Sequence, residues 1–173
     1  MNRQEFLQKS SLFALGTTIL SFSSSFKTPD TGLTNWAGNL RYSAKNVVYP
    51  TTVEELRVEV LKIKGGKALG SQHSFNTVAD TTETLISTSK LNKVLSIDKD
   101  KMWVWVEGGI KYGTLGLYID QRGYAIHNLA SLPHISVMGA SSTATHGSGD
   151  KNGNLSMGAC GNSGTNLTIL VKN

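Results

Sequence analysis

The chain has 173 residues, of which 39% are hydrophobic and 17% charged, and its formal net charge is +5. A chain of this length can bury one hydrophobic core and has room for little more than one domain. The 17 Lys and Arg residues are scattered, without an arginine cluster or a recognition motif, so we interpret the charge as a solvated surface and expect no nucleic-acid partner. The single cysteine, Cys160, excludes an internal disulfide.

Residues 1–30 differ in composition from the rest of the chain. Arg3 and Lys9 flank a polar start, Leu12 to Phe22 forms an apolar run, and a serine-rich stretch follows. The apolar run is about half of the roughly 20 residues that a membrane-spanning helix needs, so it predicts an export signal and no stable membrane span. The polar start resembles a degenerate twin-arginine signal with Gln4 in place of the second arginine; an ordinary secretory signal or an uncleaved anchor is the alternative. The predicted location is periplasmic or otherwise extracytoplasmic.

Two short apolar runs, at residues 47–49 and 67–69, predict strands with a helix between them. Thr51 and Glu54 form a capping-box pattern that predicts the start of this helix. Apolar residues then recur at helical spacing up to Ile63, before a pair of glycines ends the pattern.

Residues 84–88, 94–97 and 102–106 predict three further strands. In the last strand Trp103 and Trp105 alternate with apolar residues, so we expect a central strand covered on both faces and interpret both tryptophans as core residues rather than cofactor contacts.

A second helix is predicted by the spacing of Tyr112, Leu115 and Ile119 and ends near Gly123, and residues 124–126 predict a brief strand. From His127 onward, small and hydroxylated residues follow one another with little periodicity. We expect this segment to lie along an extended dinucleotide, with hydroxyl groups donating to phosphates.

The loop of residues 70–76, Gly-Ser-Gln-His-Ser-Phe-Asn, directly follows the strand predicted at 67–69. Its small residues allow backbone N–H groups to converge on an anion, as in the amide nests that bind phosphates. His73 places a nucleophilic imidazole at the centre of the loop. The loop keeps only the first glycine of a dinucleotide fingerprint, which disfavours a nicotinamide-type Rossmann fold.

Three other segments accompany this loop in a fixed order: Asn-Trp-Ala-Gly-Asn at 35–39, Asn-Leu-Ala-Ser-Leu-Pro-His-Ile-Ser-Val at 128–137 and Ser-Thr-Ala-Thr-His-Gly-Ser-Gly at 142–149. Together they resemble the alditol (xylitol) oxidases. These are FAD enzymes related to the sugar-lactone oxidases, within the vanillyl-alcohol-oxidase or PCMH-type flavoprotein superfamily. The resemblance implies an α+β fold in which two α/β subdomains hold FAD between them.

The resemblance divides the chain into three parts. Residues 1–30 are the export segment, 34–155 the PCMH-type FAD-binding domain and 156–173 a divergent or truncated tail. In the tail, residues 167–171 are either the next strand of the domain, reached after a local insertion, or part of a stretch that replaces it.

The resemblance also implies a cofactor and the residues that bind it. The cofactor is FAD, with a covalent bond from His73 to the flavin 8α carbon, and a neutral imidazole is a competent nucleophile toward such an electron-poor carbon. Gln72 stands where the family usually has Gly, which adds a Cβ beside the loop. The other cofactor-binding positions are Ala68, Leu69, Gly70, Ser71, Gln72, Ser74, Ser131, Ser136, Gly139, Thr143, Ala144, Thr145 and His146.

The function implied is that of an oxidase that acts on CH–OH groups of polyols, with dioxygen as acceptor and hydrogen peroxide as product. The alternatives are an aldonolactone oxidase or dehydrogenase of the same superfamily and a truncated, non-catalytic flavin-binding module. Family members are more than twice as long and have a second domain that shapes the substrate pocket. We therefore expect this chain to contain no catalytic residue of its own and to be inactive alone.

The four histidines, His73, His127, His134 and His146, lack the close spacing of common zinc sites, and no metal site is expected. We interpret His146 as a flavin contact and His134, after Pro133, as a cap of its loop.

Overall fold

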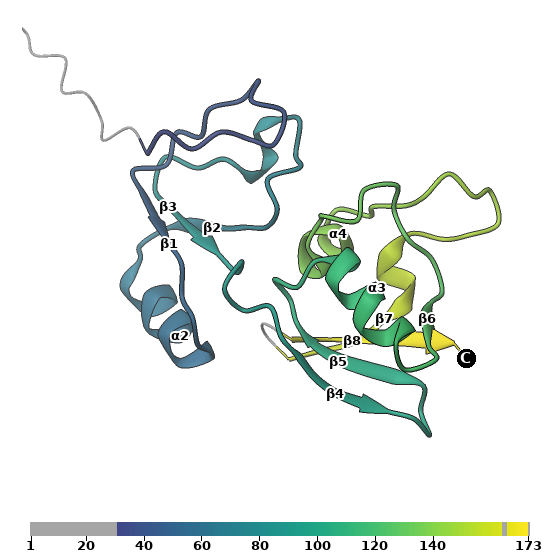
Figure 1. The fold of residues 1–173 in the computed structure, drawn as a ribbon. Coiled ribbons are helices and arrows are strands. Elements are labelled where there is room, and N and C mark those ends of the chain that lie inside the picture. The colour runs from purple at the N-terminus through teal and green to yellow at the C-terminus, as the bar shows by residue number, and fades with distance from the viewer. Residues whose placement is uncertain (1–30, 164–165, 173) are drawn as a thin grey trace, which may run out of the picture.

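The computed structural model describes residues 31–163 and 166–172, so the predicted export segment at 1–30 lies outside the described residues. The described chain forms two sheets that lie side by side, each with its own helices (Figure 1). The predicted α+β class is confirmed.

The first sheet is parallel and has the strand order β1-β3-β2. Its strands are β1 (Asn46–Val48), β2 (Gly66–Leu69) and β3 (Thr84–Ser87), and helix α2 (Val53–Lys62) connects β1 to β2. The short 3-10 helix η1 (Thr77–Ala79) lies between β2 and β3. The carboxyl end of β2 therefore delivers the 70–76 loop, as predicted.

Helix α2 begins one residue later than the predicted capping box. The hydroxyl oxygen of Thr52 accepts the backbone N–H of Glu55 at 3.1 Å, and the Glu55 carboxylate accepts the backbone N–H of Thr51 at 2.7 Å. The prediction of Thr51 and Glu54 was wrong by one position because the box pattern Thr-x-x-Glu occurs twice in succession, and both pairs satisfy it.

The second sheet is antiparallel and has the order β4-β5-β8-β6, with β7 also paired to β8. Its strands are β4 (Val94–Asp98), β5 (Trp103–Glu107), β6 (Ala125–Ile126), β7 (Ala159–Ser163) and β8 (Asn166–Lys172). Helices α3 (Tyr112–Asp120), α4 (Val137–Ser142) and η2 (Leu155–Gly158) accompany it. The residues predicted to be extended after His127 thus include a short helix, α4, which the irregular sequence pattern did not indicate.

The largest hydrophobic cluster joins this sheet to helices α3 and α4. Val104 and Val106 of β5 are fully buried in it, together with Leu115 and Ile119 of α3. Trp103 and Trp105 lie on the other face of β5 and are only partly buried, so the prediction of a strand covered on both faces holds for one face alone.

The C-terminal strand is an interior element of the second sheet. Residues 167–171 lie within β8, which pairs with β5 on one side and with β6 on the other. Of the two alternatives for this segment, the structure therefore shows a strand.

No helix among residues 31–163 or 166–172 is long and apolar enough to cross a membrane.

Candidate functional site

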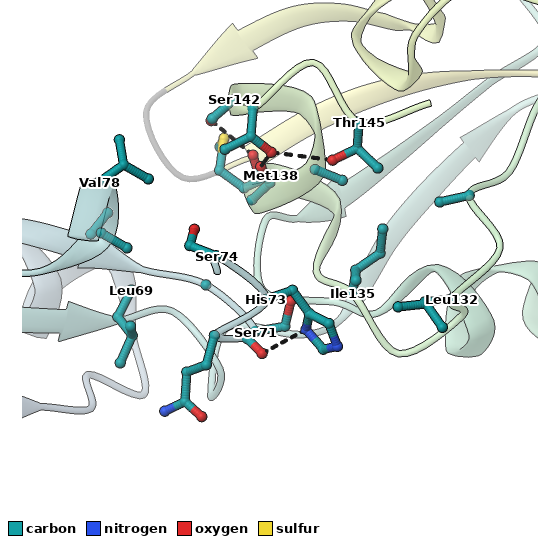
Figure 2. A pocket seen from close by; sticks show the side chains of 18 of the residues that line it. Leu69, Ser71, His73, Ser74, Val78, Leu132, Ile135, Met138, Ser142 and Thr145 are labelled. Carbon is teal, nitrogen blue, oxygen red and sulfur yellow. Dashed lines mark hydrogen bonds between the residues drawn. The ribbon is translucent and has the colours of Figure 1, made fainter. Parts of the chain in front are cut away.

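A cavity of about 490 Å³ lies between the loop that follows strand β2 and the segment around helix α4 (Figure 2). The first sheet contributes residues 68–75 of the loop and its preceding strand, and the second contributes residues 130–132 and 138–140 around helix α4. A cavity of this size, built from two parts of the fold, falls in the range of about 300–1,000 Å³ found for cofactor and small-molecule sites.

The structure brings nearly all the predicted cofactor-binding residues into this cavity. Twelve line it, namely Ala68, Leu69, Gly70, Ser71, Gln72, His73, Ser74, Ser131, Gly139, Thr143, Thr145 and His146. Ser136 and Ala144 are not among the lining residues. Ser136 is 4% exposed and lies behind the wall, where its backbone N–H donates to the Ser71 hydroxyl oxygen at 3.1 Å.

The 70–76 loop and helix α4 approach each other closely where Gly70 faces Gly139. A Cβ on Gly70 would lie 2.9 Å from the Ser136 hydroxyl oxygen, and a Cβ on Gly139 would lie 2.7 Å from the same atom. The hydroxyl oxygen of Ser136 is buried and has no hydrogen-bond partner in the protein. The absence of side chains at Gly70 and Gly139 lets the loop approach helix α4 closely beside this unpaired hydroxyl, and the two glycines form a cradle of exposed backbone such as phosphate-binding nests use.

Gln72 adopts a left-handed backbone conformation, with φ of +64°. This is the conformation that glycine adopts without steric cost, so the structure explains why glycine suits this position and what the glutamine side chain changes. The backbone N–H of Trp36 donates to the Gln72 carbonyl oxygen at 2.8 Å and holds the loop in this conformation.

The surroundings of His73 favour its neutral imidazole form. Its Nδ1 lies 2.8 Å from the Ser71 carbonyl oxygen, which can only accept, so Nδ1 carries the proton and Nε2 keeps a lone pair. Nε2 is buried and unpaired in the protein. Burial lowers the pKa of His73, the nearby charges of His134 and Lys111 lower it further, and only the bond to Ser71 opposes this.

Two aromatic rings lie against this imidazole. The Trp36 ring stacks on His73 with centroids 5.0 Å apart, and the His134 ring lies 4.6 Å from His73 and 5.5 Å from Trp36. His134 therefore packs on His73, beyond the loop-capping role we expected. Within the described residues, no group of three or more His, Cys, Asp or Glu side chains gathers to hold a metal.

Sequence reasoning missed part of the cavity wall. The missed residues are mostly apolar: Phe75, Val78, Ala79, Thr88, Ala130, Leu132, Ile135, Met138, Ala140 and Ser142. Leu132 and Ile135 lie inside the 128–137 motif, so their place in this motif could have indicated that they line the cavity. Val78 and Ala79 reach the cavity from η1, for which no sequence pattern was available. Trp103 and Trp105 do not line this cavity, but instead border a smaller hollow of about 130 Å³.

Residues 44–162 match the family described as "FAD binding domain". The chain belongs to this family. The Gly70–Gly139 cradle, the unpaired Ser136 hydroxyl and the predominantly apolar wall all fit a flavin with its phosphates, and the prediction of FAD as the cofactor is confirmed.

The chain is similar to two groups of sugar oxidoreductases. It is 43% identical over 128 residues to an alditol oxidase from a Streptomyces species, a match that covers 72% of this chain and 31% of that protein. It is 34% identical over 128 residues to an L-gulonolactone oxidase from Scyliorhinus torazame, covering 70% of this chain and 28% of that protein. The chain thus spans about a third of the length of these relatives and covers their FAD-binding part.

Among solved structures, an alkyldihydroxyacetonephosphate synthase shares the fold with a TM-score of 0.60 and 17% identity, covering 73% of this chain and 31% of that chain. This likeness shows a shared fold alone and carries no statement about the substrate.

Proposed function

We propose that this chain is the FAD-binding part of an oxidase that oxidises CH–OH groups of polyols, with dioxygen as acceptor and hydrogen peroxide as product. The observation that carries the proposal is the cavity, in which the 70–76 loop and the 128–149 segment meet. The 43% identity to an alditol oxidase supports a polyol as substrate. When bound, the flavin supplies a hydride acceptor for a carbinol carbon and an electron donor for dioxygen.

The residues of this chain hold and orient the cofactor in this proposal. The loop supplies backbone N–H groups and the Ser71 and Ser74 hydroxyls for the phosphates and the ribityl chain. Ser131, Thr143 and Thr145 supply further hydroxyls along the opposite wall. The apolar side chains of Leu132, Ile135 and Met138 exclude water from the ring system.

His73 is the proposed site of a covalent bond to the flavin 8α carbon. The new C–N bond replaces one C–H bond of the 8α methyl group and the N–H bond of the imidazole. The two protons and two electrons released are accepted by dioxygen, which becomes hydrogen peroxide. The neutral state of His73 supports this role, because only an unprotonated nitrogen has a lone pair to share.

The test is an acid-denatured gel of the purified protein loaded with FAD, viewed for flavin fluorescence. We expect a fluorescent band that disappears in His73→Ala and remains in His127→Ala, which changes an imidazole outside the cavity lining. A band that persists in His73→Ala contradicts the proposed bond, whereas a dark wild-type band that still retains flavin absorbance before denaturation indicates non-covalent binding only.

An aldonolactone substrate is the second candidate, favoured by the 34% identity to an L-gulonolactone oxidase. Hydrogen peroxide release from the flavin-loaded protein with xylitol and with an aldono-1,4-lactone separates the two. Peroxide from the polyol alone supports the first proposal and peroxide from the lactone alone the second. Covalent flavin without peroxide from either substrate is the result expected if this chain only holds the flavin, either as the FAD-binding part of an oxidase or as a non-catalytic module.

We also propose that the protein is exported, by a signal within residues 1–30 whose composition supports a twin-arginine-like route. Fractionation of expressing cells, with mass measurement of the mature N-terminus, tests this. Periplasmic protein that depends on Arg3 supports the proposal, and full-length protein confined to the cytoplasm contradicts it.

A further inference from the structure

The turn at residues 35–40 is attached to both sides of His73. The backbone N–H of Trp36 donates to the Gln72 carbonyl oxygen at 2.8 Å, and the side-chain Nδ2 of Asn35 donates to the Ser74 carbonyl oxygen at 3.1 Å. The carbonyl groups of the residues on either side of His73, Gln72 and Ser74, are therefore each bonded to one of two adjacent residues from a distant part of the sequence.

Asn35 is suited to hold such a connection rigidly. Its side chain is 3% exposed and is fully engaged, since Nδ2 also donates to Asn39 Oδ1 at 2.8 Å and Oδ1 accepts the backbone N–H of Leu40 at 3.0 Å. Its backbone N–H donates to the Leu40 carbonyl oxygen at 2.9 Å, which closes the turn. A buried side chain with every bond satisfied fixes the geometry of the groups it joins.

Trp36 adds a contact to the imidazole itself. Its ring stacks on His73 at an interplanar angle of 25°, yet Trp36 is 56% exposed and does not line the cavity. A ring that is more than half exposed gains little from burial, and the ring contacts of Trp36 are with His73 and His134. Neither Trp36 nor His134 lines the cavity that His73 faces, so the two rings support the imidazole from behind.

We propose that the 35–40 turn is a positioning device for His73, in which Asn35 holds the backbone of the loop and Trp36 fixes the direction of the imidazole before the cofactor arrives. This inference rests on the proposed flavin bond of His73. Positioning matters for such a bond because a nucleophile that is already aligned avoids the entropy cost of alignment during the reaction. Asn35 and Trp36 are positioning residues and do not react.

The test follows covalent attachment separately from flavin binding. FAD is added to flavin-free protein, total bound flavin is measured by absorbance, and covalent flavin is measured by gel fluorescence over time. We expect Trp36→Ala to bind FAD as the wild type does and to form the covalent bond about 10- to 100-fold more slowly, because a misplacement of about 1 Å can cost about 100-fold in rate. Trp36→Phe retains a stacking ring and is expected to recover most of the rate.

Tyr49→Ala is the matched control, because Tyr49 is an aromatic residue that is 47% exposed and lies outside the cavity wall. We expect it to behave as the wild type. Asn35→Ala removes three hydrogen bonds and is expected to slow attachment further if it folds; Trp36→Ala keeps the backbone bond to Gln72 and tests the proposal even if Asn35→Ala does not fold.

Two results overturn the proposal: wild-type attachment rates in Trp36→Ala, or a loss of total and covalent flavin in equal proportion, which is the mark of a purely structural turn. Failure of the proposed flavin bond is recognised separately, by a His73→Ala protein that stays fluorescent or by a wild-type protein that never becomes fluorescent.

In that case an NMR titration of His73 in flavin-free protein tests whether Trp36 holds the imidazole in place. Loss of Trp36 should raise the pKa of His73 toward its ordinary value, while the charges of His134 and Lys111 remain; an unchanged titration overturns the inference.

Discussion

Gln72 shows how a single residue in the cofactor loop is held against its local preference. A residue with a Cβ loses roughly 1–2 kcal/mol in the left-handed region, and nothing in the side chain of Gln72 is seen to offset this. The conformation is instead maintained by the bond from Trp36 to the Gln72 carbonyl oxygen, so a distant turn determines the local backbone.

Replacement of this residue by glycine is therefore expected to stabilise the protein. Gln72→Gly removes the left-handed strain but adds backbone freedom to the unfolded chain, and we expect a net gain of about 0.5–1 kcal/mol in the free energy of unfolding. Urea denaturation measures it. Gln121→Gly is the control, since Gln121 has a φ of −58° and its replacement brings only the entropic loss. Equal effects of the two changes would contradict the strain argument.

The lowered pKa of His73 predicts a pH dependence of stability in flavin-free protein. Because burial lowers this pKa in the folded state, the unfolded chain binds a proton at higher pH than the folded chain. The free energy of unfolding is then highest where both states are neutral, and it decreases as pH falls through the ordinary histidine value of about 6.5 toward the folded pKa.

His73→Asn removes this titrating group. Between about pH 7.5 and pH 5.5 the variant is expected to lose less stability than the wild type, as measured by denaturant midpoints across that range. Parallel pH profiles for the two proteins would show that His73 titrates normally in the folded state.

At the scale of elements, one glycine connects the two sheets. Gly109 follows strand β5, and its N–H donates to the Leu91 carbonyl oxygen at 2.9 Å. A Cβ at Gly109 would collide with the carbonyl oxygens of Thr88 and Leu91, which lie in the chain that leaves strand β3. Backbone atoms cannot yield as a flexible side chain does, so this close approach requires glycine.

We expect Gly109→Ala to lower the free energy of unfolding by about 1–3 kcal/mol, the usual range for forcing extra volume into a packed site. Gly116→Ala is the matched control, because Gly116 lies within helix α3 and has open space at its Cβ position. That change should raise stability by about 0.5–1 kcal/mol through helix propensity. Thermal unfolding of both variants gives the comparison. An unchanged stability of Gly109→Ala would show that the backbone near Thr88 and Leu91 can move to admit a Cβ.

Elements with strong local signals were predictable. The helix around Leu115 and Ile119 and the strand at Val104 carry periodic apolar patterns, and they occur where expected. Helix α4 was missed because its sequence, Val-Met-Gly-Ala-Ser-Ser, has too few residues to show a period. Its N-terminus is fixed by bonds from Val137 to Ile110 and from Met138 to Gly108, which no local pattern reveals.

At the scale of the whole molecule, strand β8 completes the second sheet. Thr168, Ile169 and Val171 are 2%, 1% and 5% exposed, so the C-terminal strand contributes to the largest core cluster. Residues 166–172 therefore belong to the folded unit, because β5 would lose a partner strand without them.

Ile169→Ala tests this contribution. Removal of a fully buried isoleucine side chain should cost about 2–5 kcal/mol in the free energy of unfolding, by lost burial and the cavity that remains. Leu117→Ala, at a position 68% exposed on helix α3, is the control and should change stability by less than about 0.5 kcal/mol. If Ile169→Ala lowers the free energy of unfolding as little as the control does, strand β8 lies outside the stable core.

The sequence by itself determined the cofactor class, the order of the main elements and most of the residues that line the cavity, because these depend on motifs and on local patterns of small, hydroxylated and apolar residues. Only the tertiary structure decided which of them meet. The contacts of Asn35 with Ser74, of Gly70 with Gly139 and of His73 with His134 join residues 39, 69 and 61 positions apart, as the subtraction of their numbers shows. Such contacts join loops that are far apart in the sequence, and no local pattern encodes which of these loops lie together.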